Sequence, residues 1–421
     1  MGTAITLQPP RGTHDALPDL SRRFRFVEET VLKVFKTYGF GEIRTPMFEA
    51  TDVFARNVGD TTDIVTKEMY TFTDRGGDNL SLRPEGTAPV VRAYYSNGLK
   101  QHLPLKLCYV GTPMFRYERP QKGRLREHHQ VGAEVFGIAG PMAEVELIAM
   151  AFDFLRALGM KEDFYVQLNS LGTSEERSKY RDALVAYFTP FKDKLSEESK
   201  DRLAKNPLRI LDSKDEGDRK LLADAPKLAD YLGNESSAHF AAVQKGLDTL
   251  DIRWQVNNTL VRGLDYYSHT VFEIHSDALG AQSQVVSGGR YNGLIGQMGG
   301  DDVPAVGFGC GVERLELMLA ADAVPENRPV AFVTMNEEAT MQSLDLARKL
   351  RAGGLEVLVA LDPLSVKAQM KRANKVNATH TIVVGEEELA SGKFVLKDMD
   401  AGTQDSLSPE DIIASLCGGA L

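Results

Sequence analysis

The sequence predicts an α+β fold in which an antiparallel-sheet domain carries a helical insertion and is followed by a smaller α/β unit. Three observations lead to this prediction. Short strand-like runs dominate most of the chain, a charged block with helical periodicity interrupts them, and strands alternate with helices after residue 330. The length of 421 residues fits two or three domains. We expect a first domain over residues 1–325, with the insertion at about 171–250, and a second over 330–421.

The elements of the first domain follow from the spacing of apolar residues. A helical stripe predicts a helix over 21–38, ended by Gly39. Strand-like runs at 105–110 and 131–136 predict an antiparallel pair joined by a long loop, and a second helix is expected over 141–158. Further strands are expected in FYVQLNS, IRWQVNN, TVFEIH, QVVSGG and AVGFGCG, the last leading into the helix VERLELMLA.

The second domain begins after a proline-containing linker at 320–329. Strand-like runs PVAFVTM, LEVLVAL, THTIVVG and KFVLKDM alternate with helical segments at 337–352, 364–377 and 408–416, which indicates a compact α/β unit. Four basic residues follow one helical face: Lys367, Lys371, Arg372 and Lys375. That face is either an RNA-binding surface or an ordinary solvated one.

Composition excludes several classes of protein. No run of eighteen apolar residues suggests a membrane span, and the first residues lack the pattern of a signal peptide. Three widely spaced cysteines argue against a disulfide framework and against a zinc site, so we expect a cytoplasmic protein. The net charge of −10 argues against a protein that coats nucleic acid indiscriminately.

Residues 115–130, FRYERPQKGRLREHHQ, concentrate positive charge in this acidic chain. Because like charges repel, the cluster indicates an anionic partner, although a solvated loop is the alternative. The sequence has neither a GxxxxGK[ST] motif nor a GxGxxG fingerprint after a strand, so arginine side chains would have to hold a nucleotide. Five arginines in polar, glycine-punctuated contexts are candidates for phosphate contacts: Arg83, Arg116, Arg262, Arg290 and Arg314. For each of them a structural ion pair is the alternative.

A second set of polar residues lies near strand-like runs. Glu134 stands in VGAEVF, and Gln130 four residues earlier shares its face if the strand is regular. A buried carboxylate needs a cationic or donor partner, whereas an edge-strand glutamate would face water. Tyr266 and Tyr267 follow Arg262 and are either core aromatics or part of the same site.

Five segments together resemble the signatures of bacterial-type histidyl-tRNA synthetases, which are class II aminoacyl-tRNA synthetases. RTPMFE resembles the first class II motif, FRYERPQKGRLREHHQVGAEVFG the second and AVGFGCGVERLELML the third. RGLDYYSHTVFEI and SGGRYNGLI resemble two histidine-specific signatures. The five occur in the family's order over nearly the whole chain. The resemblance implies the class II catalytic fold followed by an anticodon-binding domain.

The resemblance also implies an activity and its partners. It implies a cytoplasmic homodimer, with Pro46 at the dimer interface, that uses ATP and Mg²⁺ to convert L-histidine to histidyl-adenylate and then esterifies tRNA(His). No protein-ligated metal is expected. By the same resemblance, Arg116 and Arg262 provide positive charge at the α-phosphate, while Arg314 holds the phosphate tail. Fixed positive charge at that point would stabilise two anions as they approach each other.

The substrate contacts follow from the same motifs. The residues that the resemblance assigns to histidine are Glu85, Gly86, Thr87, Gln130, Glu134, Tyr266 and Tyr267, and those that it assigns to the acceptor end of tRNA are Gln121, Arg124 and Arg126. Glu85, Thr87 and Gln130 are expected at the α-amino group, and Glu134, Tyr266 and Tyr267 around the imidazole. An amino acid without imidazole's donor and acceptor would leave these groups unpaired, so we expect no editing domain.

Two other functions are compatible with parts of this sequence. One is the regulatory subunit of ATP phosphoribosyltransferase, a synthetase-like protein that senses histidine without charging tRNA. Such proteins lack the anticodon-binding domain and lose the catalytic arginine signature, both of which this sequence retains. The other is an ATP-binding protein that acts on a different amino acid, which the signature from Arg262 to Tyr267 disfavours.

Overall fold

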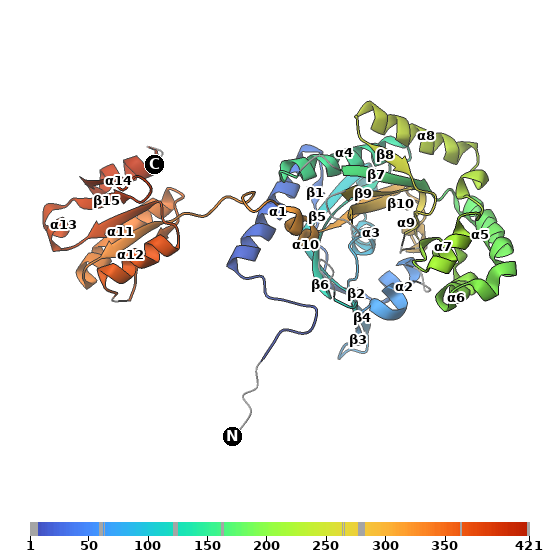
Figure 1. Cartoon of the computed structure of the whole chain (residues 1–421), viewed down its shortest axis with the longest axis horizontal. Helices are drawn as coiled ribbons and strands as arrows, with labels where there is room; N and C mark the ends of the chain where they lie inside the picture. The colour runs from blue at the N-terminus through green and yellow to red at the C-terminus, as the bar shows by residue number, and fades with distance from the viewer. Residues whose placement is uncertain are drawn as a thin grey trace, which may run out of the picture. The chain divides into compact units, whose positions relative to one another are not determined.

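The computed structural model describes residues 7–58, 62, 64–120, 125–160, 164–262, 264, 266–276, 283–362 and 364–418. The chain divides into two compact units, Met1–Val324 and Pro325–Leu421 (Figure 1). The predicted α+β class, with an antiparallel sheet, a helical insertion and a separate C-terminal unit, is confirmed. Within the described ranges, no helix has both the length and the apolar character needed to cross a membrane.

An eight-stranded sheet forms the centre of the first unit. Its strands, in spatial order, are β1 (Gly41–Glu42), β5 (Leu105–Phe115), β6 (Glu127–Phe136), β11 (Ala305–Gly311), β10 (Gln284–Arg290), β9 (Ser268–Ser276), β7 (Phe164–Ser170) and β8 (Trp254–Val256). The inner pairs are antiparallel, and only the outermost strands, β1 and β8, pair parallel with their neighbours. Each strand between β1 and β8 therefore has a neighbour on both sides, and its side chains point alternately to the two faces of the sheet.

Strands β5 and β6 form the predicted antiparallel pair, but both are longer than predicted. Their pairing continues past an irregularity between Tyr109 and Thr112 as far as Phe115 opposite Glu127. The added segments are polar, so the apolar-run criterion missed them, while backbone hydrogen bonding does not depend on side-chain polarity. The basic segment consequently begins and ends in the sheet, and only residues 116–126 connect the strands.

Helices α1 (Pro18–Thr37) and α4 (Met142–Ala157) cover one face of this sheet. The predicted stripe on α1 is buried, as Val27, Val31 and Phe35 are fully removed from solvent. Helix α10 (Val312–Met318) packs beside α1, and Arg23 of α1 donates to Glu316 of α10 at 2.5 Å. Helical periodicity therefore identified the packed face correctly.

The helical insertion lies between β7 and β8. Its helices are α5 (Ser174–Phe188), η3 (Thr189–Lys194), α6 (Glu197–Lys205), η4 (Pro207–Asp212), α7 (Glu216–Leu222), η5 (Leu228–Tyr231) and α8 (Asn234–Thr249). Thr173 closes a capping box on α5, which explains where that helix begins. The buried carboxylate of Asp218 on α7 accepts hydrogen bonds from the hydroxyls of Ser196, Ser199 and Ser213, which ties α6 to α7.

A three-stranded antiparallel sheet and several short helices complete the first unit. The strands are β2 (Phe48–Ala50), β4 (Asn79–Leu82) and β3 (Thr71–Thr73), and the helices are α2 (Asp52–Val58), η1 (Ile64–Glu68), α3 (Thr87–Ser96), η2 (Leu99–His102) and α9 (Leu294–Gln297). This small sheet has exposed apolar side chains on Phe48 and Phe72, and so has Met47, which directly precedes β2.

The second unit is a five-stranded sheet with helices. Its strands, in spatial order, are β13 (Val357–Leu358), β12 (Val330–Thr334), β14 (His380–Val384), β15 (Phe394–Asp398) and β16 (Gln404–Leu407), and its helices are α11 (Glu337–Ala352), α12 (Val366–Lys375), α13 (Glu386–Ser391) and α14 (Pro409–Cys417). Strands β13, β12 and β14 are parallel, and β15 and β16 add antiparallel. Strand β16 and helix α13 were not predicted, because both are short and carry few apolar residues.

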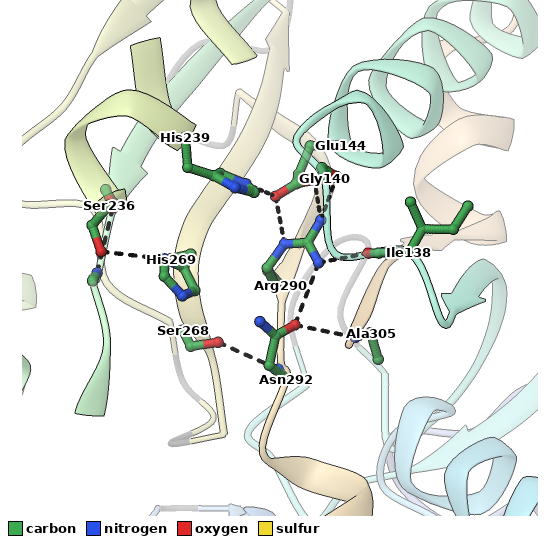
Figure 2. A network of polar contacts seen from close by, with 12 residues as sticks. Ile138, Gly140, Glu144, Ser236, His239, Ser268, His269, Arg290, Asn292 and Ala305 are labelled. Atoms are coloured by element: carbon green, nitrogen blue, oxygen red, sulfur yellow. Dashed lines mark hydrogen bonds and ion pairs between the residues drawn. The ribbon is translucent and has the colours of Figure 1, made fainter. Parts of the chain in front are cut away.

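A buried ion pair joins α4, β10 and the insertion (Figure 2). Both Arg290 on β10 and Glu144 on α4 are fully buried, and Nε of Arg290 lies 2.7 Å from Oε1 of Glu144. The remaining N–H groups of Arg290 reach the carbonyls of Ile138 and Gly140, and His239 on α8 shares the same carboxylate at 2.7 Å. Burial alone would raise the pKa of Glu144, but the hydrogen bonds from His239 and Arg290 outweigh it and lower the pKa.

Replacing Arg290 with Ala should destabilise the first unit strongly. The change leaves the carboxylate of Glu144 buried without its main counter-charge, a situation that costs about 3–5 kcal/mol. Urea denaturation of the purified protein would measure the loss. Lys179→Ala, which breaks the exposed ion pair with Glu175 on α5, is the control and should change stability little. Equal effects of the two changes would contradict the prediction.

Candidate active site

Glu85 lies at the start of α3 and is almost completely buried. Its carboxylate accepts hydrogen bonds from the backbone N–H groups of Thr87 and Ala88, at 2.8 and 2.7 Å, so it caps the helix. Burial raises the pKa of Glu85 above its usual value despite these bonds. Gly86 is required here, because a Cβ at this position would lie 2.3 Å from the ring of Tyr109.

Glu134 lies near the middle of the sheet on β6, with no exposed surface. Its carboxylate accepts hydrogen bonds from the hydroxyls of Thr87, at 2.8 Å, and Tyr291. Gly307 stands opposite it on β11, where a Cβ would lie 1.7 Å from the carboxylate. Burial raises the pKa of Glu134 to about 8. The alternative of an edge-strand glutamate facing water is wrong, because β6 is paired on both sides.

Gln130 shares the face of Glu134. It precedes Glu134 by four residues on β6, pairs with Gly311 on β11 and is half-buried. The same face is rich in glycine: Gly132 on β6 and Gly309 on β11 also lie beside it. A Cβ at Gly132 would lie 2.3 Å from the Tyr109 ring. The glycines thus leave the space above these strands to Tyr109 and to the polar side chains.

Three tyrosines surround the two carboxylates. The rings of Tyr266 and Tyr267 lie 4.7 Å apart between centroids, and the ring of Tyr291 lies 5.6 Å from that of Tyr266. The hydroxyl of Tyr266 is 3.5 Å from Oε2 of Glu85. All three rings are buried, and burial raises the pKa of each hydroxyl, that of Tyr266 and Tyr291 well above the usual value, so the hydroxyls keep their protons. Tyr266 and Tyr267 are therefore buried aromatics, and Tyr266 also lies beside Glu85; their role as site residues stays a prediction.

Arg262 lies between β8 and β9 and is largely buried. Its guanidinium pairs with Glu273 on β9 and stands 5.8 Å from the ring centroid of Tyr267. Among the described residues its Nε has no hydrogen-bond partner. Such a buried donor is costly unless something else engages it, which is typical of a ligand contact.

Arg116 and Arg314 lie at the same end of the sheet as the ion pair between Arg262 and Glu273. Arg116 follows the last residue of β5 and donates from Nε to the carbonyl of Pro84 at 2.7 Å, which places it directly beside Glu85. Arg314 on α10 donates to the carbonyl of Gln284, the first residue of β10. The strand register places this end of β10 opposite the end of β9 that follows Glu273.

Two of the five candidate arginines have structural roles instead. Arg83 is buried and donates to the carbonyls of Pro113, at 2.7 Å, and Thr45, at 2.8 Å. Arg290 belongs to the buried ion pair of Figure 2. Sequence context could not separate them from the others, because a structural arginine also occurs beside glycine in a polar stretch.

The basic segment is only partly within the described residues. Arg126 donates from Nε to the carbonyl of Glu118 at 3.2 Å, and its guanidinium stacks on the ring of Tyr117, 4.0 Å from the centroid. Gln121 and Arg124 lie outside the described residues. The exposed ring of Tyr117 therefore holds the guanidinium of Arg126 by a cation–π contact.

The sequence did not identify Tyr291, Tyr109 or Glu273 as site residues. The signal that points to the first two is the set of glycines at neighbouring strand positions, because glycine inside a strand often marks a close approach by another group. Glu273 lies on β9 in register with Ser287, and although it falls within RGLDYYSHTVFEI, nothing in its neighbourhood marks it as the partner of Arg262. Within the described part of the chain, no group of three His, Cys, Asp or Glu side chains could hold a metal ion.

Comparison with known proteins gives consistent matches over both units. The family model described as "Histidyl-tRNA synthetase" matches residues 12–315, and that described as "Anticodon binding domain" matches residues 329–416. A histidine–tRNA ligase of Rhodospirillum rubrum is 54% identical over 401 residues, which cover 95% of this chain and 96% of that protein. A histidine–tRNA ligase of Gluconacetobacter diazotrophicus is 48% identical over 414 residues, which cover 98% of this chain and 99% of that protein.

Solved structures agree with these matches. The crystal structure of apo histidyl-tRNA synthetase from S. aureus has a TM-score of 0.82 and 33% identity, and covers 98% of this chain and 100% of that one. A structure from Bacillus halodurans, described as an ATP phosphoribosyltransferase regulatory subunit/histidyl-tRNA synthetase, has a TM-score of 0.66 and 22% identity. The match covers 91% of this chain and 99% of that one, and shows a shared fold. The resemblance inferred from the five motifs is thus confirmed, and the chain belongs to the histidyl-tRNA synthetase family.

Proposed function

We propose that this chain acts in the cytoplasm as a histidine–tRNA ligase, which activates L-histidine with ATP and transfers it to the 3′ end of tRNA(His). The observation that carries this proposal is the pair of buried carboxylates, Glu85 and Glu134, enclosed by tyrosines at the centre of the sheet. Polar groups buried in this way suit a small polar ligand. We assign catalysis to residues 1–325 and anticodon binding to residues 330–421, in accord with the two family models.

The pocket's chemistry matches the chemistry of histidine. We assign the α-amino group to Glu85, Gly86, Thr87 and Gln130, and the imidazole to Glu134, Tyr266 and Tyr267. A neutral imidazole has one N–H donor and one acceptor, which a carboxylate and a phenol can satisfy together. An apolar amino acid of similar size would leave both unpaired, a penalty that can give discrimination of about 10⁴-fold. No editing site is needed for such selectivity.

The arginines suit the activation step. A carboxylate oxygen of histidine bonds to the α-phosphorus of ATP, while the bond from that phosphorus to the pyrophosphate oxygen breaks. Because two anions approach, fixed positive charge lowers the barrier. We assign Arg116 and Arg262 to this charge and Arg314 to the phosphate tail. The Nε of Arg262, which lacks a partner among the described residues, supports its assignment. In the second step a ribose hydroxyl of the terminal nucleotide attacks the carbonyl carbon and AMP leaves.

We propose that Mg²⁺ accompanies the triphosphate. The described residues offer no cluster able to hold a metal ion alone, whereas Mg²⁺ commonly binds through substrate phosphates with few protein ligands. The ion would add positive charge at the pyrophosphate when bound. The protein's part is to orient that group through Arg314.

Transfer-RNA binding and dimerisation complete the proposal. We assign Gln121, Arg124 and Arg126 to the acceptor end, where phosphates and unpaired nucleotides would meet the basic segment. A homodimer is supported by the exposed apolar side chains of Met47 and Phe48 next to Pro46, since such groups commonly mark interaction surfaces.

The alternative function is a histidine-sensing regulatory subunit without ligase activity. The Bacillus halodurans structure shows that this fold occurs under both names in its title. The C-terminal unit, which matches the anticodon-binding family model, and the arginine set favour the ligase.

Histidine-dependent exchange of pyrophosphate into ATP tests the function directly. Among the twenty amino acids, only histidine should support exchange, and only histidine should then be transferred to tRNA. Arg262→Ala should lower the exchange rate by at least about 10²-fold, because it removes a charge that faces the reacting phosphate. The variant should melt at a lower temperature than the parent, because Glu273 loses its partner, and the exchange is therefore measured at a temperature at which melting shows the variant folded. Near-normal turnover in this variant would remove Arg262 from its assigned role.

Glu134→Gln should make stability depend less steeply on pH. The pKa of Glu134 is about 8 in the folded chain and lies near 4.5 when unfolded, so between these values the folded state holds the extra proton. Stability from this group therefore falls as pH rises through that window, by about 1.4 kcal/mol per unit at most. The free energy of unfolding of the variant minus that of the parent, measured by urea denaturation, should increase from pH 5 to pH 8. The exposed Glu235→Gln is the control, and a pH-independent difference at Glu134 would contradict the prediction.

Arg126→Ala should impair tRNA charging more than histidine activation. Loss of one contact to the nucleic acid should raise KM for tRNA about ten-fold, while exchange, which needs no tRNA, stays within about two-fold. Tyr117→Ala should act in the same direction, because it removes the ring on which the guanidinium stacks. Equal losses in both reactions would count against a role in tRNA binding.

A further inference from the structure

The segment that carries Arg262, Tyr266 and Tyr267 has little regular structure of its own. It connects β8 to β9, and its described residues before Ser268 belong to neither strand. The backbone ladder of the sheet therefore does not fix it. Something else has to hold it if a guanidinium and two phenols are to keep their positions in the site.

Two arginines of the helical insertion hold the two ends of this segment. Arg209 on η4 donates from Nη1 to the backbone carbonyl of Arg262 at 3.1 Å. Arg177 on α5 donates from Nη1 to the backbone carbonyl of Tyr267. Each bond joins a charged donor to a main-chain acceptor, which is stronger than a neutral hydrogen bond. The first unit places these insertion helices together beside the sheet (Figure 1).

The two arginines are themselves fixed within the insertion. The carbonyl of Arg209 accepts a hydrogen bond from Arg202 on α6 at 3.1 Å, and Arg202 pairs with Glu198 at 2.6 Å. Ile210, next to Arg209, is fully buried in the insertion's core. Arg177 precedes the buried Tyr180 by three residues on the same helix, so the two project from neighbouring positions.

Apolar packing alone leaves part of this boundary open. A cavity of about 410 Å³ separates residues 257–259, which lead into the segment, from the insertion. Its lining includes Tyr180 of α5 and Leu222 of α7. Packing against the insertion therefore does not by itself hold the residues that lead into the segment, and polar anchors contribute, among them Asn169 on β7, which donates to the carbonyl of Leu260 at 3.0 Å.

We propose that Arg209 and Arg177 are positioning residues of the histidine-activation reaction, through which the helical insertion holds Arg262 and Tyr267 in place. This inference rests on the proposed function, because it concerns the same site. Arg209 acts on the residue assigned to the reacting phosphate, whereas Arg177 acts on the residue assigned to the imidazole. The two should therefore affect different kinetic constants.

The experiment measures kcat and KM for histidine in the exchange reaction, using the full chain. Arg209→Met, which keeps the aliphatic stem but loses the donor, should lower kcat about ten-fold and leave KM within about two-fold. Arg177→Met should instead raise KM for histidine about ten-fold. Lysine at either position should recover part of the loss, because its ammonium can still donate to the carbonyl; a role in packing alone would not show this recovery.

The matched control is Arg181→Met, on the same helix as Arg177. Arg181 is exposed and its hydrogen bonds are to Ser178 and Asp182 nearby, so both constants should stay at the parent's values. If the parent shows no histidine-dependent exchange, the proposed function itself is wrong. If the parent is active and Arg209→Met and Arg177→Met match Arg181→Met, the inference is wrong.

A second variant keeps the test decisive if Arg209→Met does not fold. Arg202→Met removes the support of Arg209 one step farther from the site. A lower kcat with the parent's KM would support the inference, and an unchanged kcat would overturn it. Thermal melting of each variant identifies those that retain the native fold.

Discussion

The burial of one carboxylate, that of Glu134, constrains the centre of this structure. An ionised carboxylate is costly to remove from water, so it needs donors on several sides or keeps its proton. Thr87 and Tyr291 supply two donors from different elements, and Gly307 provides the space that the carboxylate occupies. These two hydrogen bonds link helix α3 and the turn after β10 to β6, while β11 is held beside β6 by its own backbone ladder.

The same constraint bears on the selectivity that we propose for the pocket. Groups arranged to satisfy a buried acid cannot move far without leaving it unpaired, so the pocket is rigid before a ligand arrives. The tyrosine rings add shape, and their raised pKa values keep their hydroxyls as donors over the physiological range. In the proposed function, recognition and stability oppose each other here, because the buried acid assigned to the ligand destabilises the folded chain as the pH rises.

Much of the architecture could be predicted from the sequence. The stripe on α1 and the pairing of β5 with β6 follow from periodicity, because burial there is the dominant force. The polar ends of β5 and β6 could not be predicted, since backbone pairing extended them without an apolar pattern. Arg83 and Arg290 resembled the other candidate arginines in context, and only tertiary partners separate them. Tyr291 was missed because its meaning depends on Glu134, which is 157 residues away.

The adjacency of Arg290 and Tyr291 has a consequence for engineering. One residue anchors the buried charge network that joins α4 to the insertion, and the next one donates to the pocket's central acid. Backbone shifts at either position are transmitted across a single peptide bond. A substitution at Tyr291 would therefore disturb two buried polar networks at once, that of Arg290 with Glu144 and that of Glu134.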